Sequence, residues 1–97
     1  MPKAYWVSAY QEIIDEDKLA AYAKIAGPAV TAAGGRFLTR GVAAKAFEAG
    51  VVERTTVIEF DSLDVAMAAH ETPEYQRALA ALGNGVKRDL RIVEGVD

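Results

Sequence analysis

Residues 34–41 read GGRFLTRG, and this stretch decides the fold because it joins the end of a helix to a long β-hairpin. The pair Gly34-Gly35 is typical of a helix end, where glycine adopts a left-handed backbone at little cost. The following residues predict a hairpin with one arm over 36–47, a turn at Ala49-Gly50 and a second arm over 51–60.

The residues before the glycines predict a strand and then a helix. Residues 3–11 are rich in aromatic and β-branched side chains, which favour a strand, and both faces of this strand are predicted to be buried. Asp15 can cap a helix whose apolar residues recur at helical spacing: Leu19, Tyr22, Ala23, Ala26, Val30 and Ala33. Pro28 lies inside this pattern, so we expect a kink or a break near Gly27.

After the hairpin, helical patterns return and the chain ends in a strand. Asp61 or Ser62 can cap a helix that places four residues on one face: Leu63, Ala66, Met67 and His70. Thr72-Pro73 begins another helical segment, and Gly83-Asn84-Gly85 stops it. Residues 88–94 then predict a strand with Leu90 and Ile92 on one face.

The element order βαββαβ predicts an α+β domain of ferredoxin-like topology, with an antiparallel sheet and its helices on one face. Several large apolar residues cannot all lie under the helices, because neighbouring strand residues point to opposite sides: Trp6, Tyr10, Phe37, Phe47, Val57 and Phe60. A second copy of the chain commonly covers such leftover apolar surface. We therefore expect a homodimer packed sheet to sheet.

Composition places the chain among small globular domains. Its 97 residues, 52% hydrophobic and 26% charged, suit one domain over residues 1–97 with a single core. The net charge of -3 provides no basic surface for nucleic acid or for an anionic membrane. The sequence has no cysteine for a disulfide or a thiolate site, and no apolar run of signal-peptide or membrane-spanning length. We expect a cytoplasmic protein with neither nucleic-acid nor membrane partners.

Four motifs also resemble a known family: GGRFLTRG (34–41), VIEF (57–60), TPEYQ (72–76) and IVEGVD (92–97). From residue 5 to the C-terminus the chain resembles the bacterial domain-of-unknown-function family numbered thirteen-thirty, of the dimeric α/β-barrel superfamily. The resemblance implies a ferredoxin-like protomer whose sheet joins that of a partner to form a barrel. Superfamily relatives include cofactor-free monooxygenases, lactone isomerases and haem-binding enzymes, so the resemblance implies no single activity. Residues 43–49 are richer in alanine than this resemblance leads us to expect.

Arg40 and Glu59 are the first candidate site residues. With a turn at Ala49-Gly50 and no bulge, Arg40 faces Glu59 across the hairpin, whereas a bulge at Gly41 shifts the register by one. Strand alternation places Arg36 on the same face as Arg40. In the functional hypothesis, one of these arginines holds an anionic or enolate oxygen while Glu59 moves a proton. In the alternative, the charges form a structural ion pair that sets the hairpin register or the dimer seam.

His70 is the only histidine, and it has three interpretations. It is a core or helix-end residue that hydrogen-bonds locally, a proton donor at the mouth of the cleft between helices and sheet, or an axial haem ligand. One histidine without cysteine cannot form the usual zinc ligand set. No metal or cofactor is therefore predicted.

The aromatic residues are candidates for lining a ligand site. The phenol of Tyr75 can hydrogen-bond a ligand, or its ring can cover the core, and Tyr22 presents the same choice. Trp6 and Tyr10 share one face of the first strand and can wall a pocket or a dimer seam. We interpret the pair Arg88-Asp89 as solvated or capping charges before the last strand.

Two functions follow from these candidates. The first is an enzyme that uses metal-free acid/base or oxygenase-type chemistry on a small substrate in the cleft between sheet and helices, with Arg40 and Glu59 central. The second is a non-catalytic homodimer that binds a small metabolite. A barrel interior filled with side chains would instead indicate a purely structural module.

Overall fold

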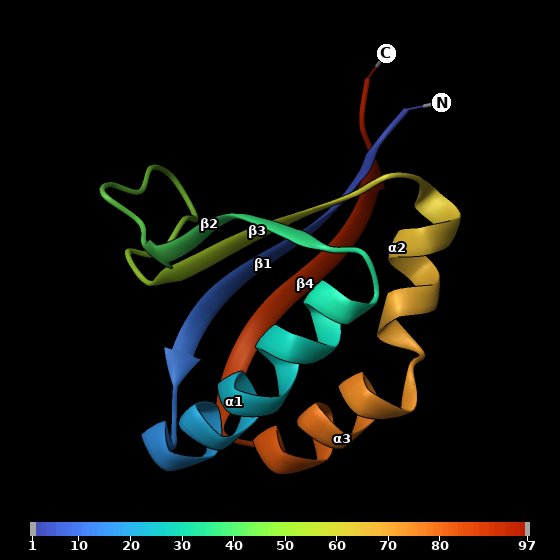
Figure 1. Ribbon diagram of the computed structural model, residues 1–97. Coiled ribbons are helices and arrows are strands. Elements are labelled where there is room, and N and C mark those ends of the chain that lie inside the picture. Colours follow the sequence, from blue (N-terminus) through green and yellow to red (C-terminus); the bar gives the residue numbers. More distant parts are fainter. Residues whose placement is uncertain (1, 97) are drawn as a thin grey trace.

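The computed structural model describes residues 2–96 as one sheet with helices against one of its faces (Figure 1). In chain order the elements are β1 (Ala4–Ile13), α1 (Glu16–Ala32), β2 (Arg36–Val42), β3 (Arg54–Phe60), α2 (Leu63–His70), α3 (Pro73–Leu82) and β4 (Val86–Glu94). The strands are antiparallel in the order β2-β3-β1-β4. This is the predicted ferredoxin-like arrangement, with the second helical region divided into α2 and α3. None of the described helices is long and apolar enough to cross a bilayer.

Helix α1 begins where the sequence predicted but does not break at Pro28. The Asp15 carboxylate accepts hydrogen bonds from the backbone N–H groups of Asp17 (3.0 Å) and Lys18 (3.1 Å), which caps the helix. The helix then continues unbroken through Pro28. A proline removes a single backbone donor, and burial of neighbouring residues such as Val30 holds the helix against the core.

The hairpin is shorter than predicted, and its bulge lies elsewhere. The paired strands end at Val42 and Arg54, so the expected turn lies inside a longer loop over residues 43–53 (Figure 1). There the Gly50 N–H donates a hydrogen bond to the Phe47 carbonyl oxygen at 2.9 Å. Alanine favours strands weakly, which explains why the alanine-rich residues 43–49 do not extend β2. The register shift between β2 and β3 falls between Phe37 and Thr39. The bulge therefore lies there, and the alternative of a bulge at Gly41 is wrong.

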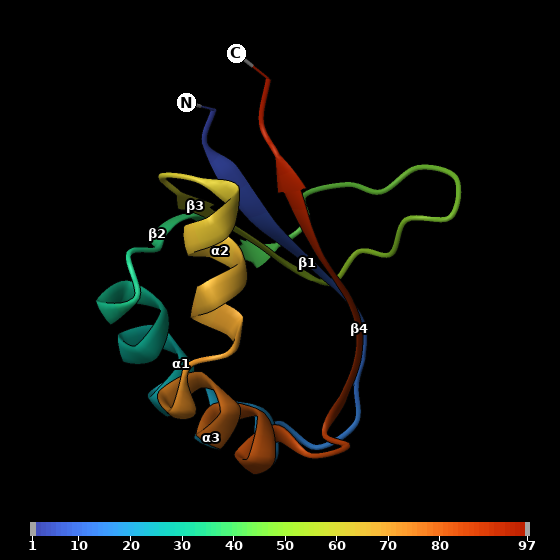
Figure 2. The ribbon, with the colours of Figure 1, turned by 90° about the vertical axis from the view of Figure 1, so that its right-hand side faces the viewer.

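All three helices pack on the same side of the sheet (Figure 2). The predicted caps Ser62 and Thr72 accept hydrogen bonds from the third residue beyond them, at 3.2 Å in both cases. The core beneath the helices includes the fully buried side chains of Trp6, Tyr75, Phe60 and Val30. Only the helix-facing side of β1 is buried, and Ala9 on the other side is exposed. The prediction that both faces of this strand are buried is therefore wrong for the single chain.

Candidate functional site

A cavity lies between the helix-facing side of the sheet and the helices α1 and α3. Its volume is about 50 Å³. This is several times the roughly 10–15 Å³ that one water molecule needs, and far below the roughly 300–1,000 Å³ of a site for drug-sized ligands. The cavity therefore suits a compact ligand of a few heavy atoms.

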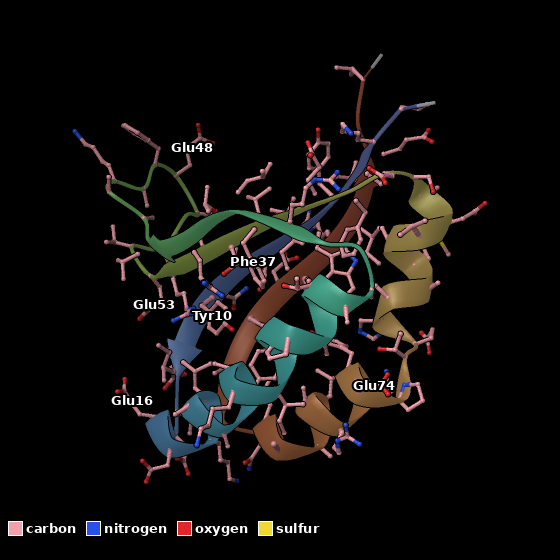
Figure 3. All side chains as sticks on the ribbon, viewed as in Figure 1. Tyr10, Glu16, Phe37, Glu48, Glu53 and Glu74 are labelled. Atoms are coloured by element: carbon pink, nitrogen blue, oxygen red, sulfur yellow. The ribbon has the colours of Figure 1, made fainter. Side chains whose placement is uncertain are left out.

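Cross-strand rows of side chains form the floor of this cavity. One row is apolar: Phe37, Ile58 and Trp6. The next row begins with the charged Arg40, continues through the hydroxyl residues Thr56 and Ser8, and ends at the apolar Leu90. The third region is basic, with Arg54 on β3 and with Arg88 paired to Tyr10. Figure 3 shows Tyr10 and Phe37 between the sheet and α1, whereas Glu48 projects from the distant 43–53 loop.

Arg88 lies at the centre of a cluster of phenols. Its Nη1 donates hydrogen bonds to the hydroxyl oxygens of Tyr10 (3.3 Å) and Tyr22 (3.1 Å), and its Nη2 donates to that of Tyr75 (3.2 Å). The hydroxyls of Tyr22 and Tyr75 are also hydrogen-bonded to each other at 2.8 Å. The guanidinium carbon lies 4.9 Å from the centroid of the Tyr22 ring. The interpretation of Arg88 and Asp89 as one pair of solvated or capping charges is therefore wrong, since Arg88 points into the core and Asp89 pairs with Arg91.

The protonation states of this cluster follow from burial. Burial raises the pKa of Tyr22, and its contact with Tyr75 raises it further. Burial likewise raises the pKa of Tyr10, although the positive charge of Arg88 opposes this shift. Desolvation by itself would lower the pKa of Arg88, but the surrounding phenol oxygens outweigh it, and the pKa of Arg88 lies above its ordinary value. At neutral pH Arg88 therefore carries a positive charge beside the neutral phenols of Tyr10 and Tyr22.

Arg40 and Arg54 add two further guanidinium groups to the lining. Arg40 is exposed at the mouth, and its guanidinium lies over the ring of Phe37, 4.4 Å from the centroid. Within residues 2–96, none of the three lining arginines has a carboxylate within 4.0 Å, and no aspartate or glutamate lines the cavity. The lining is therefore positively charged without internal compensation.

The predicted pairing of Arg40 with Glu59 is wrong, because the two residues lie on opposite faces of the sheet. The strand register places Arg36 opposite Glu59 and Arg40 opposite Thr56. Arg36 Nε donates to Glu59 Oε1 at 3.0 Å, and the Tyr5 hydroxyl donates to Oε2 at 3.3 Å. The bulge after Phe37 inverts the alternation of side chains along β2. Arg36 and Arg40 therefore lie on opposite faces of the sheet, and the prediction that they share a face is wrong.

The remaining candidates divide between the cavity and its surroundings. Trp6, Tyr10, Tyr22 and Tyr75 line the cavity, whereas His70 does not. The imidazole of His70 packs on the outer side of this aromatic group, with its centroid 5.2 Å from that of Tyr75, and Nδ1 is 3.4 Å from Glu71 Oε1. His70 also lines a second hollow of about 420 Å³ between α2 and β4, together with Met67, Glu71 and Ile92.

Four polar lining residues were missed as site candidates: Ser8, Arg54, Thr56 and Arg88. A signal for Arg88 exists in the sequence, because strand alternation places it on the same face as Leu90 and Ile92. For Ser8, its place between Trp6 and Tyr10 on one face of the first strand is a similar signal. The sequence contains no comparable signal for Arg54, because the predicted hairpin paired this residue with a different partner on the first arm than the structure does.

Solved structures with the same fold cover nearly the whole chain. A protein of unknown function from Rhodopseudomonas palustris has a TM-score of 0.76 and 14% identity, covering 99% of this chain and 84% of the other. A dimeric ferredoxin-like protein of unknown function from Thermobifida fusca has a TM-score of 0.65 and 17% identity, covering 97% and 92%. SnoaB, a cofactor-independent oxygenase from Streptomyces nogalater, has a TM-score of 0.66 and 11% identity, covering 100% and 96%. At these identities the likeness shows the fold alone.

No curated protein matches the chain at a significant level. A family model does match it, over residues 3–96, and confirms the resemblance inferred from the four motifs. The chain belongs to the family described as Domain of unknown function (DUF1330).

Proposed function

We propose that this protein binds a compact organic anion, with a carboxylate as the charged group, in the cavity between the sheet and helices α1 and α3. The observation that carries this proposal is the uncompensated charge of the lining, with three guanidinium groups and no carboxylate among the described residues. A charge removed from water is costly unless it is paired, and this applies to Arg88, which is partly desolvated. Arg40 and Arg54 add positive charge to the same lining, so an anion satisfies it better than a neutral ligand does.

The donor count of Arg88 supports a carboxylate. A guanidinium has five N–H groups, and the phenols of Tyr10, Tyr22 and Tyr75 take three of them. The Nε–H and one Nη2–H remain, which suits the two oxygens of one carboxylate. The aromatic rings around the guanidinium exclude water from that contact and so strengthen it.

Binding is proposed in preference to the acid/base chemistry considered from the sequence. Glu59 lies on the opposite face of the sheet, and His70 does not line the cavity. Within the lining, burial raises the pKa of Tyr22 and of Tyr10, which keeps these two phenols protonated at neutral pH. The cavity is therefore suited to holding an anion and poorly suited to abstracting a proton.

Replacing Arg40 or Arg54 by glutamine should weaken binding of a small carboxylate such as propionate by roughly tenfold each, because each variant loses a charged hydrogen-bond donor. Isothermal titration calorimetry at constant ionic strength measures this loss. Arg36→Gln is the matched control, since Arg36 lies on the same strand as Arg40 but pairs with Glu59 on the other face. An equal loss in Arg36→Gln, or no saturable binding of any short-chain carboxylate to the unaltered protein, would contradict the proposal.

We also infer that the protein forms a homodimer through the open face of the sheet, which is the side opposite the helices. Half-buried Val7 and Val57 lie directly opposite each other there, and Val93 on β4 is 52% exposed. The dimeric ferredoxin-like protein described above supports this inference. A second copy would cover the apolar residues that the helices leave exposed.

The variant Val57→Glu should convert this dimer to a monomer, because it places a charge at the centre of an apolar contact. Size-exclusion chromatography with light scattering distinguishes the two masses. Met67→Glu is the control, since Met67 is 53% exposed on α2, on the helix side. A Val57→Glu protein that stays dimeric, or an unaltered protein that is monomeric at all concentrations, would refute the inferred interface.

A further inference from the structure

The hydroxyl of Ser8 is a buried polar group without a partner. Ser8 is 4% exposed and lines the cavity. Its Oγ has no hydrogen-bond partner among the residues that the structure describes. Buried hydroxyls are normally hydrogen-bonded, so one that faces a cavity is a binding group for whatever occupies the cavity.

The sheet explains why the protein itself does not satisfy this hydroxyl. Ser8 lies on the central strand β1, which pairs with β3 through Thr56 and with β4 through Leu90. The backbone groups around it are therefore engaged in ladders on both sides. Its neighbours along the same face, Trp6 and Tyr10, direct their polar atoms to Ala66 and Arg88 respectively.

The position of Ser8 relative to the arginines sets the spacing of the polar groups that a ligand would need. Arg88 is diagonal to Ser8 across the β1–β4 pair, two residues before its direct partner Leu90. The two side chains point to the same face of the sheet, and both line the cavity. A carboxylate on the guanidinium and an oxygen on the adjacent carbon of the same small molecule can therefore each accept one hydrogen bond, from Arg88 and from Ser8 respectively.

We propose that the ligand is a short hydroxy or keto acid, whose carboxylate is held by the arginines and whose second oxygen accepts a hydrogen bond from Ser8 Oγ. This proposal rests on the proposed anion-binding function and deepens it. A short acid also agrees with the cavity volume of about 50 Å³. Thr56 lies beside Ser8 in the same row and is 8% exposed, so the second oxygen enters a region that is already polar.

Three probes that share a three-carbon carboxylate test this assignment: propionate, lactate and pyruvate. The unaltered protein should bind lactate or pyruvate roughly 3- to 10-fold more tightly than propionate, the factor expected of one additional hydrogen bond. In Ser8→Ala this preference should fall to about one, while the affinity for propionate stays the same. Calorimetric titrations of each protein with each acid give the ratios.

Ser62→Ala is the matched control, because it removes a serine hydroxyl that caps α2, away from the cavity. It should lower the melting temperature without changing the preference. Ser8→Ala should keep the melting temperature of the unaltered protein, since its hydroxyl has no partner in the described chain.

The outcomes separate this proposal from the anion-binding function. Equal affinity of the unaltered protein for all three acids, or an unchanged preference in Ser8→Ala, would overturn the role of Ser8 while leaving arginine-dependent binding intact. A fall in melting temperature for Ser8→Ala larger than that for Ser62→Ala would also overturn it, because the hydroxyl would then have a structural partner. If no acid binds, or if binding does not depend on Arg40 and Arg54, the proposed function itself fails.

Discussion

Arg88→Met should weaken binding of a short carboxylate by about 100-fold or more, the largest effect that we expect on binding. Removing one partner of a desolvated, hydrogen-bonded charge pair typically costs roughly 2–5 kcal/mol. The guanidinium of Arg88 is partly desolvated by the aromatic rings around it. Two of its N–H groups are not used by the phenols and are available to a carboxylate. Methionine keeps an apolar stem of similar shape but supplies neither charge nor donor.

Two comparisons test whether this loss reflects the guanidinium itself. Arg88→Lys keeps the charge without the planar fork, so its loss of affinity should be smaller than that of Arg88→Met. Arg91→Met removes a guanidinium from the same strand on the opposite face, where Arg91 pairs with Asp89 at 2.9 Å, and should leave binding unchanged. Titration calorimetry measures affinity, and circular dichroism checks that each variant is folded. Equal affinities of the Arg88→Met and unaltered proteins would contradict the assigned carboxylate contact.

Gly35→Ala should destabilise the fold by about 2 kcal/mol, within the range for overpacked cores. Gly35 is buried, and a methyl group there would lie 2.6 Å from Val30 Cγ1, 2.9 Å from Ile58 Cγ2 and 3.0 Å from Phe60 Cζ. These contacts come from α1 and β3 together, so no single side chain can move aside. For a domain of this size the melting temperature should fall by roughly 8–16 °C.

Gly41→Ala is the matched control for this experiment. A methyl group at Gly41 meets nothing within 4 Å, and Gly41 lies in the same strand as the arginines of the motif. Its stability should stay unchanged or rise slightly, because alanine restricts the unfolded chain more than glycine does. Differential scanning calorimetry compares the two variants, and equal melting temperatures would show that the core accommodates the added methyl at Gly35.

Local signals in the sequence predicted the element order and most of the helix ends. The caps Asp15, Ser62 and Thr72 are short-range features, because each side chain bonds a backbone group two or three residues later. The placement of Trp6 and Tyr10 on one face of β1 was also predictable, since it follows from the alternation of a regular strand.

The placement of the candidate site could not be obtained in this way. The faces of Arg36 and Arg40 depend on a single bulge after Phe37, and strand alternation inverts at such a point. The register of the hairpin depends equally on where its turn lies, and the chain turns at Glu48-Ala49, one residue before the predicted Ala49-Gly50. The positions of the bulge and of the turn depend on tertiary packing. Phe37 packs against the core, and this burial outweighs the regular pairing of β2 with β3.

The sequence by itself therefore determined the ferredoxin-like order of elements and the family to which the chain belongs. The motif GGRFLTRG contains this information because helix ends and strands arise from interactions over a few residues. Only the tertiary structure decided that Arg40, Arg54 and Arg88 line the same cavity as Ser8 and that Glu59 lies on the other face of the sheet. Residues from β1, β2, β3 and β4 come together there through strand register, and register is a property of the assembled sheet.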